Sequence, residues 1–178
     1  MKNTRTQLII GLCSVTVSLS AVTPQWPQFR GPNASGVAEN AHPPIYFGPD
    51  TNLIWKVTVP PGVSAPVVWG ERLFLTALAS NQLVTLAYDT RDGRELWRRI
   101  APADKIEACH QFSSPAAPTP CTDGERIYVH FGSFGMLAYD FNGKEAWRRS
   151  FEPLPNKYGT ASSPILAGGM LIFADRVV

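Results

Sequence analysis

The 178-residue chain is poor in cysteine, histidine and charge, with 3 Cys, 3 His and only 17% charged residues. It contains no G-x-S-x-G, Walker-loop or H-E-x-x-H motif, so nothing in it suggests a hydrolase or a nucleotide-binding enzyme. No CxxC pair or paired-histidine spacing accompanies Cys109, His110 and Cys121. Zinc sites normally show such spacings, and we therefore expect no metal site there.

Long hydrophobic runs are also lacking, except for one uncharged stretch over residues 8–21 that follows Lys2 and Arg5 and ends in small residues. This pattern predicts a secretory signal peptide over residues 1–21, with cleavage near Ala21. The stretch is short of the ~20 apolar residues that a membrane span requires. We expect no transmembrane anchor after cleavage, and a periplasmic or extracellular location. Lipidation at Cys13 is disfavoured because its neighbour Leu12 is bulky.

The charge balance argues against a nucleic-acid partner. Removal of residues 1–21 takes away Lys2 and Arg5 and leaves 14 basic and 14 acidic side chains. A nucleic-acid surface needs clustered, uncompensated Lys and Arg. We expect no binding to nucleic acid.

Cys109 and Cys121 remain after cleavage, and the pattern leaves two interpretations open. An oxidising compartment permits a disulfide between them. Cys121, however, falls in an apolar strand pattern, which favours a small core residue.

The most informative feature is a repeat. Residues 86–99, LAYDTRDGRELWRR, return as residues 137–149, LAYDFNGKEAWRR, with one residue deleted, and the tryptophans are 50 residues apart. A second element occurs three times, at residues 65–75, 119–129 and 163–173. Periods of this size are typical of propellers and solenoids.

Each unit reads as two hairpins. The second element has a glycine-containing two-residue turn between short strands, and the first element turns at its own glycine. Alternating apolar residues, with 16 prolines and 14 glycines, argue against helices. The expected fold is all-β: a β-propeller with four-stranded antiparallel blades.

The residues also resemble a family. Residues 87–97 fit the A-x-D-x-x-x-G-x-x-x-W repeat of pyrroloquinoline-quinone-like (PQQ-like) propellers, and residues 138–147 fit it with one deletion. Residues 26–33, WPQFRGPN, resemble the opening of secreted bacterial members. The resemblance implies structural roles at the repeat positions, with both tryptophans docked on an adjacent blade: Ala87, Asp89, Gly93, Trp97, Ala138, Asp140, Gly143 and Trp147.

The same resemblance divides the chain. An extended segment is expected over 22–52, followed by a partial propeller over 53–178. The propeller would comprise a closing strand at 53–59, blades at 64–100 and 115–151, and a partial blade at 162–178, so that two complete blades and part of a third leave the ring incomplete. We expect the chain to be the amino-terminal part of a longer protein.

For function, the resemblance implies two alternatives. One is a scaffold that binds proteins, or a small ligand at the propeller face. The other is the amino-terminal part of a quinone-dependent alcohol or sugar dehydrogenase, and only this alternative calls for pyrroloquinoline quinone with calcium. No catalytic or cofactor-binding residue is assigned. Asp89, Asp92 and Asp140 fall in turns, where carboxylates accept backbone N–H bonds. Loop charge explains Asp104, Glu107 and His110, and His130 is expected to be a hydrogen-bonded blade residue.

Overall fold

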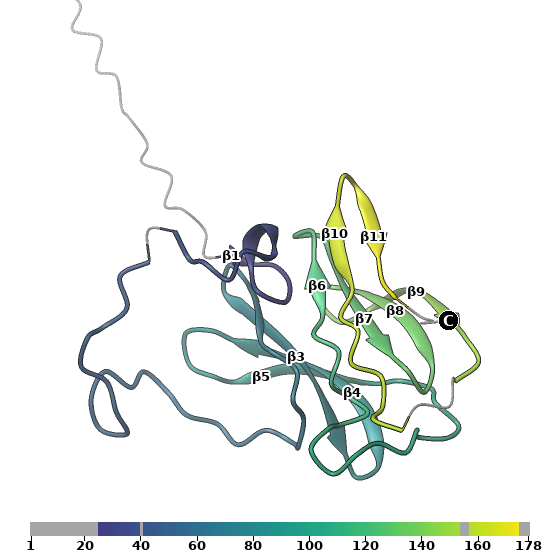
Figure 1. Cartoon of the computed structure of the whole chain (residues 1–178). Helices are drawn as coiled ribbons and strands as arrows, with labels where there is room; N and C mark the ends of the chain where they lie inside the picture. Colours follow the sequence, from purple (N-terminus) through teal and green to yellow (C-terminus); the bar gives the residue numbers. More distant parts are fainter. Residues whose placement is uncertain (1–24, 40, 154–156, 175–178) are drawn as a thin grey trace, which may run out of the picture.

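The computed structural model describes residues 25–39, 41–153 and 157–174 (Figure 1). The predicted signal peptide lies outside these residues, as does the end of the predicted third blade at 175–178. Within the described part, regular structure is β-strand except for one 3-10 turn at Pro32–Ala34. The prediction of an all-β fold is confirmed.

Blade one is an antiparallel sheet with strand order β1-β2-β3-β4-β5. Gly70 and Glu71 form the predicted two-residue turn, because Trp69 pairs with Arg72. The innermost strand, β1, was not predicted: it comes from the segment expected to be merely extended, and it pairs with β2. The bounds are β1 Gln25–Trp26, β2 Val67–Trp69, β3 Arg72–Ala79, β4 Gln82–Asp89 and β5 Glu95–Ile100.

Blade two is a four-stranded sheet in the order β6-β7-β8-β9, and a two-stranded hairpin, β10-β11, follows it. The hairpin corresponds to the first half of blade two and agrees with the start of a third blade. Together the sheets form part of a propeller, and the described residues do not close a ring. The bounds are β6 Cys121–Thr122, β7 Arg126–Phe131, β8 Gly135–Asp140, β9 Glu145–Ser150, β10 Ile165–Ala167 and β11 Met170–Ile172.

The register explains the alanine of the repeat. Ala87 lies opposite Trp97 on the neighbouring strand, and Ala138 lies opposite Trp147. Directly opposed residues share one face of a sheet, so a small side chain beside each indole leaves room for it. In both blades the register shifts immediately after the alanine.

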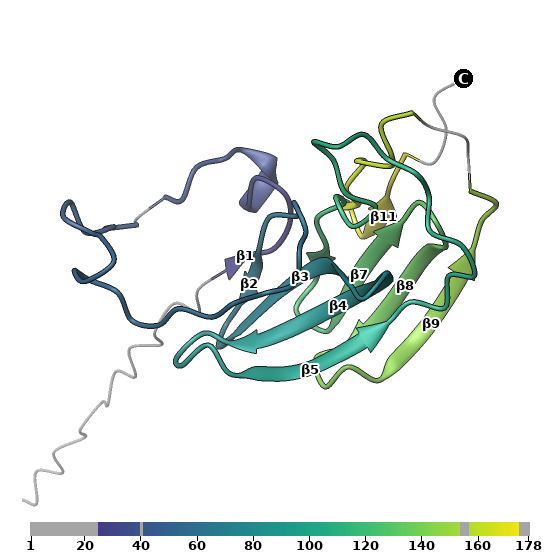
Figure 2. The same cartoon turned by 90° about the horizontal axis from the view of Figure 1, so that it is seen from below.

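The main core lies between the two blades, which stand face to face (Figure 2). Blade one contributes Phe74, Leu83 and Trp97, and blade two contributes Ile127 and Leu137 among others. The other face of blade two packs against the third sheet through Leu166 and Leu171, so apolar residues occupy both faces of its strands.

The strand predicted at 53–59 differs from the structure. These residues belong to no strand in the described structure, and the described sheets do not include the final blade that a closing strand would join, so the closing role stays a prediction. They run instead beside blade one, where Trp55 contacts the turn at Gly93.

Candidate functional site in the blade turns and the axial edge

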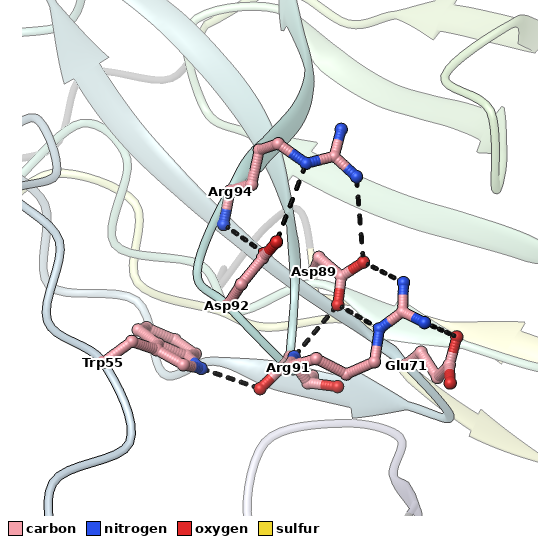
Figure 3. Close-up of polar contacts among 7 residues, drawn as sticks. Trp55, Glu71, Asp89, Arg91, Asp92 and Arg94 are labelled. Carbon is pink, nitrogen blue, oxygen red and sulfur yellow. Dashed lines mark hydrogen bonds and ion pairs between the residues drawn. The ribbon is translucent and has the colours of Figure 1, made fainter.

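The turn of blade one is organised by the carboxylate of Asp89 (Figure 3). Asp89 Oδ1 accepts hydrogen bonds from the Arg91 backbone N–H and Nε, both at 2.9 Å, and Oδ2 accepts one from Nη2 at 2.6 Å. The Arg91 guanidinium also reaches Glu71, with 3.4 Å between Nη1 and Oε2. The Asp89 side chain is only 5% exposed.

These bonds decide what Asp89 can do. Hydrogen bonds from the Arg91 side chain and backbone hold the pKa of the Asp89 carboxyl well below its usual range. A carboxylate with a strongly lowered pKa is a poor general base near neutral pH. The geometry therefore assigns Asp89 to the turn.

Blade two repeats the arrangement without the arginine. Asp140 Oδ1 accepts hydrogen bonds from the backbone N–H groups of Asn142 at 2.8 Å and Lys144 at 2.9 Å. The Gly143 N–H donates to the Asp140 carbonyl at 2.9 Å, as the Gly93 N–H does to Asp89. The aspartate and glycine of the repeat thus build one turn in both blades.

Each turn glycine receives a tryptophan from the preceding element. A Cβ on Gly143 would lie 2.7 Å from Cδ2 of the Trp97 ring, and a Cβ on Gly93 would lie 2.7 Å from Cε3 of Trp55. Trp97 Nε1 donates to the Phe141 carbonyl at 2.9 Å, and Trp55 Nε1 donates to Thr90 at 2.7 Å. A side chain at either glycine would displace the indole.

The two repeat tryptophans differ in their surroundings. Trp97 lies between the blades and is 8% exposed, whereas Trp147 lies on the far face of blade two and is 38% exposed. In the described residues the Trp147 ring meets Tyr128, with 6.0 Å between centroids, and no turn glycine. Blade one makes a second docking contact that the repeat did not predict: Trp69 covers Gly124, where a Cβ would lie 2.4 Å from the ring.

Further polar contacts join the residues that lead into the first strands of successive blades. We call β2, β6 and β10, with the two residues before each strand, the axial edge. The backbone N–H of Ala65 donates to Thr119 Oγ1 at 3.0 Å, and the N–H of Thr119 donates to Ser163 Oγ at 2.9 Å. All three residues precede the proline of the threefold element, so one position of the repeat forms both contacts. The shared position before the proline is the feature of the sequence from which these two hydrogen bonds could have been predicted.

A second pair of contacts joins β3 and β7 to the residues before β6 and β10. Thr76 Oγ1 donates to the Pro118 carbonyl at 3.0 Å, and His130 Nδ1 lies 3.1 Å from the Ser162 carbonyl. A carbonyl only accepts, so Nδ1 carries the proton. His130 is a buried blade residue whose Nε2 has no partner among the described residues.

The inter-blade loop over 101–118 contacts the segment that leads into the third blade. Glu107 Oε2 accepts hydrogen bonds from the Thr160 N–H and Oγ1 at 3.2 and 3.1 Å. The Glu107 N–H donates to Ser133 Oγ at 2.9 Å. Asp104 is exposed, and the His110 ring lies 5.3 Å from Phe112. Glu107 is thus a contact residue between loops, whereas loop charge alone was expected.

Both Cys109 and Cys121 are free thiols, so the structure contains no bridge between them. Cys121 is fully buried. Burial, with a smaller contribution from the negative charge of Asp123, raises the pKa of its thiol to about 12. Cys121 is therefore a small core residue.

The loop over residues 41–59 extends away from the sheets (Figure 1) and carries several highly exposed apolar side chains. Ile45, Tyr46 and Phe47 are 88%, 80% and 79% exposed. Reciprocal bonds between Gly48 and Thr51 close the adjoining turn, and Asn52 Nδ2 donates to the Tyr46 carbonyl at 2.6 Å. The three side chains are therefore presented on a hydrogen-bonded turn.

Within 25–39, 41–153 and 157–174, no three His, Cys, Asp or Glu side chains gather as a metal would require. The same residues include no helix long and apolar enough to cross a membrane.

Comparison with known proteins identifies one family. The family model described as outer membrane protein assembly factor BamB matches residues 47–176, almost three quarters of the chain. No curated protein matches the chain.

Proposed function

Because the chain belongs to the family of PQQ-like repeat proteins described as outer membrane protein assembly factor BamB, we propose that it is a secreted, periplasmic scaffold that binds partner proteins. The observation that carries the proposal is the loop over 41–59, on which Ile45, Tyr46 and Phe47 stand almost fully exposed. Exposed groups of large apolar side chains mark interaction sites. Aromatic residues at such sites are typical anchors of protein interfaces.

The roles of the carboxylates support a scaffold. Asp89 and Asp140 are engaged in turn hydrogen bonds, and Glu107 joins two loops. The axial edge carries Ala65, Thr119 and Ser163, whose polar groups bind one another. A small ligand at the propeller face would have to find other donors.

The quinone-dependent alternative would require carboxylates for calcium. The described residues do not gather such a group, and we assign no step of a dehydrogenase reaction to them. An assay with pyrroloquinoline quinone, calcium and a dye acceptor tests this alternative directly. Substantial oxidation of an alcohol or sugar would overturn a role as a scaffold alone.

Site-specific photo-crosslinking tests the interaction surface. A photoreactive phenylalanine analogue replaces Tyr46 in the full protein, expressed in its own cells. Glu125, whose side chain is 80% exposed on a blade turn, is the control position. We expect a discrete crosslinked protein from position 46 and none from position 125. No adduct at position 46, or equal adducts at both, would contradict the assignment.

The proposed location has a separate test. The predicted signal peptide over 1–21 lies outside the described residues, and its removal should leave a mature chain beginning at Val22. Amino-terminal sequencing of protein from the periplasmic fraction measures this. Protein that retains Met1 and remains in the cytoplasm would contradict secretion.

A further inference from the structure

Residues 25–36 lie across the axial edge and contact all three sheets; we call them the axial segment. Gln25 and Trp26 pair with Trp69 and Val68 of β2. The next residue, Pro27, accepts a hydrogen bond at its carbonyl from the N–H of Thr122 in β6, at 2.8 Å. One short stretch therefore joins the inner edges of the first two blades.

Gln28 extends the contact to the third sheet. Its Oε1 accepts a hydrogen bond from the Leu166 N–H of β10 at 3.0 Å, and the Gln28 residue is only 7% exposed. A buried amide without a partner is costly, so the bond fixes where this side chain lies. β10 belongs to a hairpin of two strands whose other strand has exposed side chains at Met170 and Ile172. Such a hairpin is marginal by itself, and contacts at its inner edge matter for its position.

The axial segment has a shape of its own. The Gly31 N–H donates to the Gln28 carbonyl at 2.8 Å, and the Gly36 N–H donates to Arg30 at 2.7 Å. Gly31 has φ +71°, and a Cβ there would lie 2.5 Å from the Trp26 ring. The indole thus folds over the glycine, and a side chain at Gly31 would displace it. This turn directs the Gln28 side chain and the Pro27 carbonyl toward different sheets.

We propose that the inner edges of β2, β6 and β10 form a binding site for an extended peptide of the Trp-Pro-Gln type, which this chain fills with its own axial segment. Recognition combines strand addition on β2, one main-chain bond to β6 and the Gln28 amide on β10. Strand addition supplies affinity in such sites, and side-chain contacts supply specificity. The site ties three successive blades together, and it is distinct from the loop that carries Tyr46.

Cleavage of the backbone beside the segment tests the proposal on the full chain. A protease site is introduced at the exposed residues 37–39, and the chain is cut under native conditions. We expect the segment to stay associated through gel filtration, and to be released by an excess of a synthetic peptide of residues 25–36. Immediate release without competitor, or loss of the β-sheet circular dichroism signal on cutting, would overturn the proposal.

Two glutamines provide a matched pair of variants. Gln28→Ala removes the bond to Leu166, and we expect retention to weaken about tenfold, as for loss of one buried hydrogen bond. Gln25→Ala, at an exposed side chain in the same segment, should leave retention unchanged. Equal retention in both variants would overturn the role of Gln28.

Hydrogen exchange gives a readout on the uncut protein. In Gln28→Ala the Leu166 amide should exchange faster, because its acceptor is gone, while the Leu86 amide in blade one keeps its protection. Unchanged exchange at Leu166 would contradict recognition of β10 by Gln28. Faster exchange at both amides would assign Gln28 to the general stability of the fold and would likewise overturn specific recognition.

Discussion

The two repeat tryptophans allow a controlled test of blade docking, because they share one sequence position and differ in burial. Trp97→Ala removes an indole that is 8% exposed and that lies against Gly143. A tryptophan buries roughly 200 Å², which at about 25 cal/mol per Å² corresponds to ~5 kcal/mol as an upper bound. Measured Trp→Ala losses in cores are about 3 to 5 kcal/mol, including the cavity.

Trp147→Ala is the matched control. Trp147 is 38% exposed, so its removal loses roughly two thirds of the buried area that is lost at Trp97, or ~3 kcal/mol on the same scale. An open face leaves no closed cavity, and among the described residues the Nε1 bond made by Trp97 to Phe141 has no counterpart at Trp147. We expect destabilisation of about 4 kcal/mol at Trp97 and about 2 kcal/mol at Trp147.

Urea unfolding followed by far-ultraviolet circular dichroism measures both free energies of unfolding. The two variants should keep the same m-value, so that the difference reports stability and not a change of the unfolded state. Equal losses, or a larger loss at Trp147, would refute the argument that docking between blades, and not the repeat position itself, makes the tryptophan important.

Three further predictions concern polar groups. Thr119→Val should lower the free energy of unfolding, measured in urea, by about 1 to 3 kcal/mol because the Ala65 N–H loses its acceptor. Thr119→Ser keeps the hydroxyl and should lower it clearly less. Equal losses would contradict the hydrogen bond from Ala65 to Thr119. The pKa of Asp89 is lower in the folded state than in the unfolded state, so its contribution to stability is complete above about pH 4 and is lost as the pH falls below that value. In Asp89→Asn, the loss of thermal stability measured below pH 4 should therefore be smaller than in the wild type. An unchanged pH profile would disprove this. In the mature chain at pH 8, a thiol reagent should label Cys109 quickly and Cys121 only after unfolding, since Cys121 is buried and the pKa of its thiol is about 12. Rapid labelling of both thiols in the folded protein would contradict the burial of Cys121.

The repeat made much of this fold predictable. Identical spacing of alanine, aspartate, glycine and tryptophan in two copies implied equivalent strands and turns, and the structure shows them with the same register and the same bulge. Such positions are readable because their roles are local: a positive φ at Gly93 and Gly143, and backbone bonds to Asp89 and Asp140. A local backbone geometry restricts which residue types can occupy the position, so it can be recognised in the sequence.

Contacts between blades were harder to predict because they join residues 44 to 138 positions apart, such as Trp97 with Phe141 and Gln28 with Leu166. The sequence around Thr119 shows only a threonine before a proline, and its contact with Ala65 becomes visible only in the folded structure. The strand expected at 53–59 shows a different limit of prediction from sequence. The resemblance assigns a closing strand to these residues, but a strand forms only where a partner edge exists.

Trp55 shows which contact of the blade interface is the more fundamental. The segment that carries it belongs to no strand in the described structure, yet its indole covers Gly93 and its Nε1 bonds to Thr90 much as Trp97 covers Gly143 and bonds to Phe141. The docking geometry is thus reproduced where strand pairing is absent. It follows that the tryptophan need not lie in a strand in order to dock, provided that the receiving turn offers a glycine without a side chain and a carbonyl within reach. The receiving turn itself lies between two paired strands, β4 and β5.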